Sequence, residues 1–153
     1  MATVIYDPDC GFCRWSLAVL LTWDRWRGRH GRPSPPHLLD RWGRSAVPGA
    51  LRPSALGTGE ADVLLADLSP AERAASWHLV DDTGARHSAG AALAPALTLL
   101  PGGGVPAAIF ARFPGATERA YRWVADHRAL VGRFVPARAR RWADRVIARS
   151  ARP

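Results

Sequence analysis

The fold is decided by residues 2–21, which read ATVIYDPDCGFCRWSLAVLL. The run Ala2–Tyr6 is apolar and β-branched, which predicts a short buried strand. Pro8 favours a turn directly after it. From Cys10 to about Trp26 the apolar residues recur with helical spacing, which predicts a helix. Its buried face is predicted to carry Leu17, Leu20 and Leu21. The only two cysteines of the chain therefore lie at a strand-to-helix junction.

Cys10 and Cys13 are separated by two residues, so on a helix they share a face and can form a disulfide that closes a very short ring. Such a short ring adds little stability to a protein. The spacing therefore favours a reversible redox role. Unpaired amide groups at the start of the helix would stabilise a thiolate on Cys10. We predict that Cys10 is the attacking nucleophile and Cys13 the resolving thiol.

Four neighbours of the cysteines are candidates for catalytic or supporting roles. Asp7 is either a proton acceptor for Cys13 or a plain turn residue. Asp9 is predicted to cap the helix. Arg14 adds a positive charge that favours a nearby thiolate, whereas the two carboxylates oppose it. Trp15, the fourth candidate, begins the apolar stripe of the helix and is expected to play a supporting role.

The rest of the chain predicts a small α/β protein. Residues 27–49 are rich in Pro, Gly and Arg and predict a surface excursion. A weak strand is predicted at 50–56, with Pro53 suited to a sheet edge, and helices are predicted to start at Thr58 or Gly59 and at Ser69. A strand at 77–80, a turn at 82–84 and a return strand at 85–88 are predicted to form a hairpin. Further helices are predicted at about 89–100, 105–113, 116–134 and 136–149.

That order of elements predicts a thioredoxin-like fold, in which a βαβ unit and a ββα unit form one mixed sheet of about four strands. Helices flank the sheet and continue into a helical C-terminal extension. We expect a thioredoxin-like domain at residues 1–135 and a basic helical tail at residues 136–153.

The charge of the chain limits its partners. All 21 basic residues are Arg, and the formal net charge is +8. The electrostatic field of such a net positive charge attracts acidic partners, anionic lipid or nucleic acid. No nucleic-acid-binding motif accompanies it, so nucleic acid is not expected. An anionic membrane surface is a better candidate than nucleic acid for the partner of this charge.

Residues 88–111 carry no charge, but prolines and a glycine run interrupt them. They therefore predict two short buried helices joined by a Gly-rich loop rather than a membrane span. No signal-peptide pattern is visible. A cytoplasmic location is expected, with peripheral membrane contact as an alternative.

The same two cysteines could instead supply half of a zinc site. Only five histidines could complete the ligand set, and no two have the spacing of a zinc finger: His30, His37, His78, His87 and His127. We therefore expect no metal and no cofactor. His78 and His87 flank the predicted hairpin turn and are expected to be neighbours on its exposed face.

Asp7, Cys10 and Cys13 together form an Asp-x-x-Cys-x-x-Cys motif. On this motif the chain resembles the DCC family of thiol-disulfide oxidoreductases, with weaker likeness at residues 77–84, 89–93 and 120–128. The resemblance implies a thioredoxin-like fold and dithiol–disulfide exchange with a protein or small-molecule thiol or disulfide. Family members also occur beside membrane proteins, which implies a membrane-associated partner as an option.

Two positions depart from these patterns. Pro8 stands where many family members have Gly, which should stiffen the turn. Thioredoxins place a cis-proline opposite the dithiol, where it shields the site and helps to dock the substrate backbone. The corresponding residues 74–77 read AASW and hold no proline.

Two other functions are compatible with the sequence. One is a non-enzymatic binding module that uses the basic C-terminal region at a membrane or protein partner, with Trp123, Trp142, Val146 and Ile147 as apolar contacts. The other is a metal-binding protein that uses the two cysteines. The position of the motif between a strand and a helix favours the dithiol oxidoreductase.

Overall fold

A four-stranded mixed sheet forms the centre of the molecule. The computed structural model describes residues 1–30 and 49–151, without the side chains of residues 26–30. The strands are β1 (Ala2–Tyr6), β2 (Leu51–Ala55), β3 (His78–Val80) and β4 (Arg86–Ser88). Their order is β2-β1-β3-β4. β1 is parallel to β2 and antiparallel to β3, which is antiparallel to β4.

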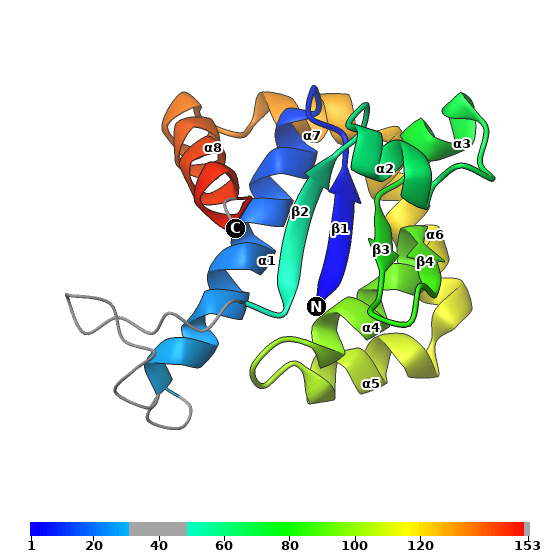
Figure 1. Cartoon of the computed structure of the whole chain (residues 1–153), viewed down its shortest axis with the longest axis vertical. Helices are drawn as coiled ribbons and strands as arrows, with labels where there is room; N and C mark the ends of the chain where they lie inside the picture. Colours follow the sequence, from blue (N-terminus) through cyan, green and yellow to red (C-terminus); the bar gives the residue numbers. More distant parts are fainter. Residues whose placement is uncertain (31–48, 152–153) are drawn as a thin grey trace.

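Helices follow the strands in the predicted order. They are α1 (Gly11–His30), α2 (Gly59–Leu64), α3 (Pro70–Ala75), the 3₁₀ helix η2 (Ala89–Ala92), α4 (Leu93–Thr98), α5 (Gly104–Arg112), α6 (Pro114–Asp126), α7 (Arg128–Arg133) and α8 (Ala137–Ser150). Figure 1 shows α1 and α8 side by side along one flank of the sheet. The predicted thioredoxin-like α/β fold with a helical C-terminal region is confirmed.

The alternation of side chains along β1 builds a core on each face of the sheet, because successive strand residues point to opposite sides. Val4 joins the larger core, together with Leu17 and Leu21 of α1. Ile5 joins the smaller core, together with Leu65 after α2. Fully burying a side chain of this size contributes about 2 kcal/mol. The predicted apolar face of α1 is thus buried, with Leu20 partly buried.

The start of β2 is fastened to α1 by one buried carboxylate. Asp24 accepts hydrogen bonds from the backbone amides of Ala50 and Leu51, each at 3.0 Å. Its side chain leaves no room at Gly49, where a Cβ atom would lie 2.0 Å from Oδ2 of Asp24. The predicted excursion at residues 27–49 begins inside α1, and its residues 31–48 lie outside the described residues. Pro53 lies in β2 at the sheet edge, as predicted.

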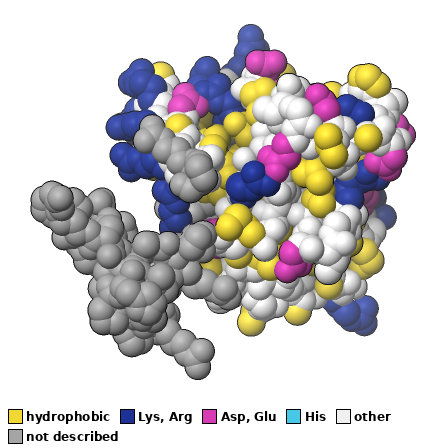
Figure 2. Space-filling view, in the orientation of Figure 1, with side chains coloured by type: hydrophobic (Ala, Val, Ile, Leu, Met, Phe, Trp, Pro, Cys, Tyr) yellow, Lys and Arg dark blue, Asp and Glu magenta, His cyan; other side chains and the backbone are white. Residues whose placement is uncertain are grey.

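α8 packs against α1 and contributes to the larger core. Ala143, Val146 and Ile147 are buried there. Val146 and Ile147 therefore contact their own domain, which leaves them unable to serve as the apolar contacts of a membrane-binding tail. The arginines of α8 are exposed, and Figure 2 shows basic side chains gathered on this flank of the molecule. Within the segment predicted as a basic tail, residues 137–150 thus form a helix that packs on α1.

The helix predicted at residues 116–134 is divided into α6 and α7. The break falls at His127, whose backbone leaves the helical region with φ −99° and ψ 8°. The ring of His127 stacks on that of Trp123, and its Nδ1 lies 2.7 Å from the Trp123 carbonyl oxygen. After the break α7 lies beside the first turn of α1, where Gly132 faces Phe12. No Gly or Pro marks this break, so the sequence pattern did not show it.

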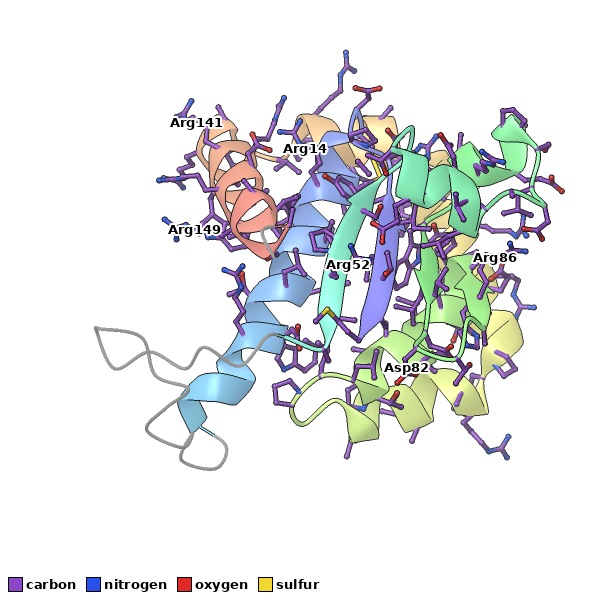
Figure 3. All side chains as sticks on the ribbon, in the orientation of Figure 1. Arg14, Arg52, Asp82, Arg86, Arg141 and Arg149 are labelled. Carbon is purple, nitrogen blue, oxygen red and sulfur yellow. A yellow bond between two sulfur atoms is a disulfide. The ribbon has the colours of Figure 1, made fainter. Side chains whose placement is uncertain are left out.

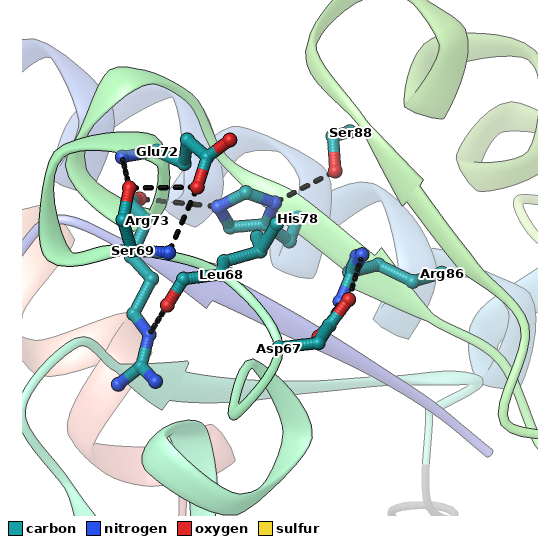
Figure 4. Close-up of polar contacts among 8 residues, drawn as sticks. All are labelled: Asp67, Leu68, Ser69, Glu72, Arg73, His78, Arg86 and Ser88. Carbon is teal, nitrogen blue, oxygen red and sulfur yellow. Dashed lines mark hydrogen bonds and ion pairs between the residues drawn. The ribbon is translucent and has the colours of Figure 1, made fainter.

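His78 is buried, which contradicts its predicted place on an exposed hairpin face. Only 1% of its surface is exposed. Its Nδ1 lies 2.8 Å from Oγ of Ser88, and its Nε2 lies 3.1 Å from the Arg73 carbonyl oxygen (Figure 4). Burial lowers the pKa of His78 below its usual value. The strand register pairs Leu79 with His87, so the two histidines point to opposite faces.

The uncharged residues 88–111 form η2, α4 and α5, with a Gly-containing turn between the last two, as predicted. α4 buries Ala96 and Leu97, whereas α5 buries Ala107 alone and exposes Val105 and Ile109, so the predicted burial of this second helix is wrong. Among the helices that the structure describes, none is both long enough and apolar enough to cross a membrane.

Candidate functional site

The two cysteines form a disulfide at the junction of β1 and α1. Their Cα atoms lie 5.2 Å apart. β1 ends at Tyr6, a four-residue connection that ends in Cys10 follows, and α1 begins at Gly11. Both cysteines are half-buried. The predicted placement of the pair at the start of the first helix is therefore confirmed.

Cys10 itself caps α1. Its carbonyl oxygen accepts a hydrogen bond from the amide of Arg14 at 3.0 Å, and its Sγ accepts one from the amide of Cys13 at 3.2 Å. These are the contacts of an N-cap residue. Asp9 does not occupy the capping position that the sequence predicted for it. Its own amide instead donates to Oδ1 of Asp7 at 2.9 Å, which holds it in the turn before the helix.

The other predicted site residues surround this cap but do not all face the sulfurs. Asp7 makes the turn contact with Asp9, and its role as proton acceptor for Cys13 stays a prediction. Arg14 forms an ion pair with Asp144 and so connects α1 to α8 (Figure 3). Trp15 is 36% exposed, and its ring centroid lies 6.2 Å from that of Phe12. An aromatic pair thus stands on the same helix turn as the disulfide.

An open depression of about 390 Å³ lies against the disulfide. One side is formed by Asp7, Asp9, Cys10 and Gly11. The other side is formed by residues of α7 and α8: Arg128, Ala129, Gly132, Arg133 and Arg140. In the part of the chain that the structure describes, Cys10 lines this depression and Cys13 does not. Of the two sulfur-bearing residues, Cys10 is therefore the one presented to it.

The three arginines of this depression were not predicted as site residues. Arg128 donates from Nη1 to the Ala74 carbonyl oxygen at 3.1 Å, and Arg140 donates from Nε to the Val135 carbonyl oxygen at 3.0 Å. Among the described residues, none of the three forms an ion pair. The only sequence signal was the high density of arginine after residue 137. Their convergence on Cys10 depends on the break at His127, which has no local signature.

The backbone before β3 lies at the disulfide end of the sheet, because β3 is antiparallel to β1 and His78 pairs with Ile5. Two of its polar groups are engaged inside the protein. The amide of Trp77 donates to the Tyr121 hydroxyl at 3.2 Å, and the carbonyl of Ala74 accepts from Arg128. This segment holds no proline. Those two groups are therefore not free to dock a substrate backbone.

Among the described residues, no group of three or more His, Cys, Asp or Glu side chains is arranged to hold a metal ion. His37 lies outside the described residues, and so does the side chain of His30.

The fold and the disulfide define a class, namely a thioredoxin-like protein with a Cys-x-x-Cys disulfide at the start of its first helix. No protein-family model, no curated protein and no solved structure matches this chain. The chemistry of the site must therefore be argued from its own residues.

Proposed function

We propose that this protein is a thiol-disulfide oxidoreductase of the DCC type, which exchanges electrons with its substrate through Cys10 and Cys13. One observation carries the proposal: the pair forms a disulfide at the start of α1, with Cys10 presented to an open depression. A disulfide that closes so short a ring adds little stability to the protein, so a purely structural role would not explain the pair.

In the reduced protein, the Cys10 thiolate attacks one sulfur of a substrate disulfide. A mixed disulfide forms, and the other half of the substrate leaves as a thiolate. The Cys13 thiolate then attacks Sγ of Cys10, which releases the second substrate thiolate. The substrate gains two electrons, and the protein loses two as Cys10–Cys13 closes. The same steps in reverse oxidise two substrate thiols, so no further reactant is needed.

The cap geometry supports Cys10 as the nucleophile. The amide of Cys13 already points at Sγ of Cys10, and a hydrogen bond to the charged form of a group favours that form. Asp7, at the rim of the depression, is proposed to receive the proton of Cys13 during the second step. A cytoplasmic location suits this chemistry, since reducing compartments hold dithiols ready for exchange.

A trapping experiment tests the proposal. The Cys13→Ser variant should react with the neutral hydroxyethyl disulfide and retain one adduct on Cys10, detected by intact-protein mass spectrometry. Wild-type protein should reduce the same compound without retaining an adduct. Cys10→Ser is the matched control, because serine can still cap α1 and keep the fold.

Absence of any adduct on Cys13→Ser, together with a wild-type disulfide that neither opens nor closes in thiol buffers, would contradict the oxidoreductase. Zinc or copper retained in stoichiometric amount by the reduced wild-type protein, and lost in Cys10→Ser, would favour the metal-binding alternative instead.

A further inference from the structure

We propose that the substrate of this site is a small anionic thiol or its disulfide, whose carboxylate or phosphate binds Arg128, Arg133 and Arg140 while its sulfur meets Cys10. The inference rests on the proposed exchange reaction and assigns its substrate class.

The first argument is position. The three guanidinium-bearing residues come from α7 and α8, and they line the same depression as Cys10. Asp7 and Asp9 lie on the β1–α1 side, and Asp7 is engaged by the Asp9 amide. An anionic group would therefore bind on the α7–α8 side, so that a sulfur a few atoms away can reach Cys10.

The second argument is charge. Five described arginines outside the depression pair with carboxylates, among them Arg52 with Glu60, Arg73 with Asp62 and Arg86 with Asp67, whereas exposed arginines such as Arg141 and Arg149 have no such pair among the described residues. The three arginines of the depression have none among the described residues. Asp7 and Asp9 line the opposite side but pair with none of the three arginines, so the cations on the α7–α8 side repel one another, and an anion between them would relieve that repulsion. Guanidinium groups bind carboxylate and phosphate in a bidentate manner, which adds geometric selectivity.

The third argument is preorganisation. Carbonyl groups hold two of the three arginines, through the bonds from Arg128 to Ala74 and from Arg140 to Val135. Each bond uses one nitrogen of the guanidinium group and leaves others free to donate. Side chains that are already ordered lose less entropy when a ligand binds.

The fourth argument concerns size. The depression of about 390 Å³ falls in the range of small-molecule sites. The neighbouring backbone that could pair with an extended polypeptide is engaged at Ala74 and Trp77. These features favour a small molecule over a protein as the species that exchanges with Cys10.

A charge series of disulfides tests the inference. Reduced wild-type protein is mixed with glutathione disulfide, which is anionic, with neutral hydroxyethyl disulfide and with cationic cystamine. Each rate is divided by that of a free model thiol with the same compound. We expect the normalised rate for glutathione disulfide to exceed that for cystamine by about tenfold or more, and to fall as salt is added.

In the Arg133→Gln/Arg140→Gln variant, the ratio of the glutathione disulfide rate to the hydroxyethyl disulfide rate should fall about tenfold. Arg145→Gln/Arg149→Gln is the matched control for net charge, since both residues are exposed on α8 and neither lines the depression; Arg149 is labelled in Figure 3. It should behave as wild type.

Binding of S-methylglutathione, an anion that cannot exchange, separates this inference from the proposed function. Calorimetry should show binding to the wild type that weakens about tenfold in the double variant. If the wild type exchanges with all three disulfides at equal normalised rates, the inference fails and the oxidoreductase stands. If it exchanges with none, the oxidoreductase fails. In that case, absence of S-methylglutathione binding overturns the anion site as well.

Discussion

Two polar regions of this molecule differ in whether their arginines pair with carboxylates of the protein. In the His78 network, formed by Asp67, Leu68, Ser69, Glu72, Arg73, His78, Arg86 and Ser88, each charged group has a partner within the protein (Figure 4). In the arginine pocket, formed by Cys10 with Arg128, Arg133 and Arg140, no described carboxylate forms an ion pair with the guanidinium groups, although Asp7 and Asp9 line the opposite side.

The difference separates stability from binding. In the His78 network, hydrogen-bond donors and acceptors pair with one another and so hold β3, β4 and α3 together. Few of these groups remain free to bind a ligand. A pocket with unmatched charge contributes little to the fold, and its interaction energy remains available to a ligand. The two regions should therefore respond differently when a side chain is removed.

The largest effect is expected in the His78 network. His78→Ala would leave a cavity and remove the partners of the Ser88 hydroxyl and the Arg73 carbonyl. We expect the free energy of unfolding to fall by about 3 kcal/mol, measured by urea denaturation. The half-buried His87 lies on the opposite face of the hairpin, and His87→Ala should change that free energy by less than about 0.5 kcal/mol. Equal losses in the two variants would refute the structural role assigned to His78.

Reduction of the disulfide should have a smaller effect. The ring closed by Cys10 and Cys13 is so short that opening it should change the free energy of unfolding by less than about 2 kcal/mol. Urea denaturation of the oxidised and reduced protein measures the difference. Unfolding of the protein on reduction would instead assign the bond a structural function.

A pH dependence of stability should follow from His78. Burial lowers its pKa in the folded protein, so below the ordinary histidine pKa the unfolded chain binds a proton that the folded protein does not. Stability should therefore fall as the pH drops from about 7.5 to about 5.5. The difference between wild type and His78→Gln, measured at both pH values, isolates this contribution. A wild-type curve parallel to that of the variant would contradict it.

The smallest effect on stability is expected in the arginine pocket. Arg133 is exposed and has no hydrogen bond or ion pair among the described residues. Arg133→Gln should therefore change the free energy of unfolding by less than about 0.5 kcal/mol, or raise it slightly by reducing repulsion. A loss comparable to that of His78→Ala would show that the pocket serves the fold.

Local signals made the framework of this protein predictable. The strand at residues 2–6, the turn at Pro8 and the apolar face of α1 follow from patterns within a few residues, and all are present. The capping box at Ser69 and Glu72 is present as well. The order of strands follows from the thioredoxin-like plan, which restricts how such elements can connect.

Features that depend on contacts between distant segments were not predictable. The burial of His78 depends on the register of β3 with β4 and on the position of the Arg73 carbonyl after α3 begins. The arginine pocket depends on the break at His127, which is stabilised by a ring stack rather than by Gly or Pro.

The clamp made by Asp24 also has a use in engineering. Because its carboxylate holds the amides of Ala50 and Leu51, the register of β2 is set by α1 rather than by the residues that connect them. The entropy of closing a loop grows only slowly with its length. A peptide inserted between α1 and β2 should therefore leave the register of β2, and the disulfide at the opposite end of the sheet, unchanged.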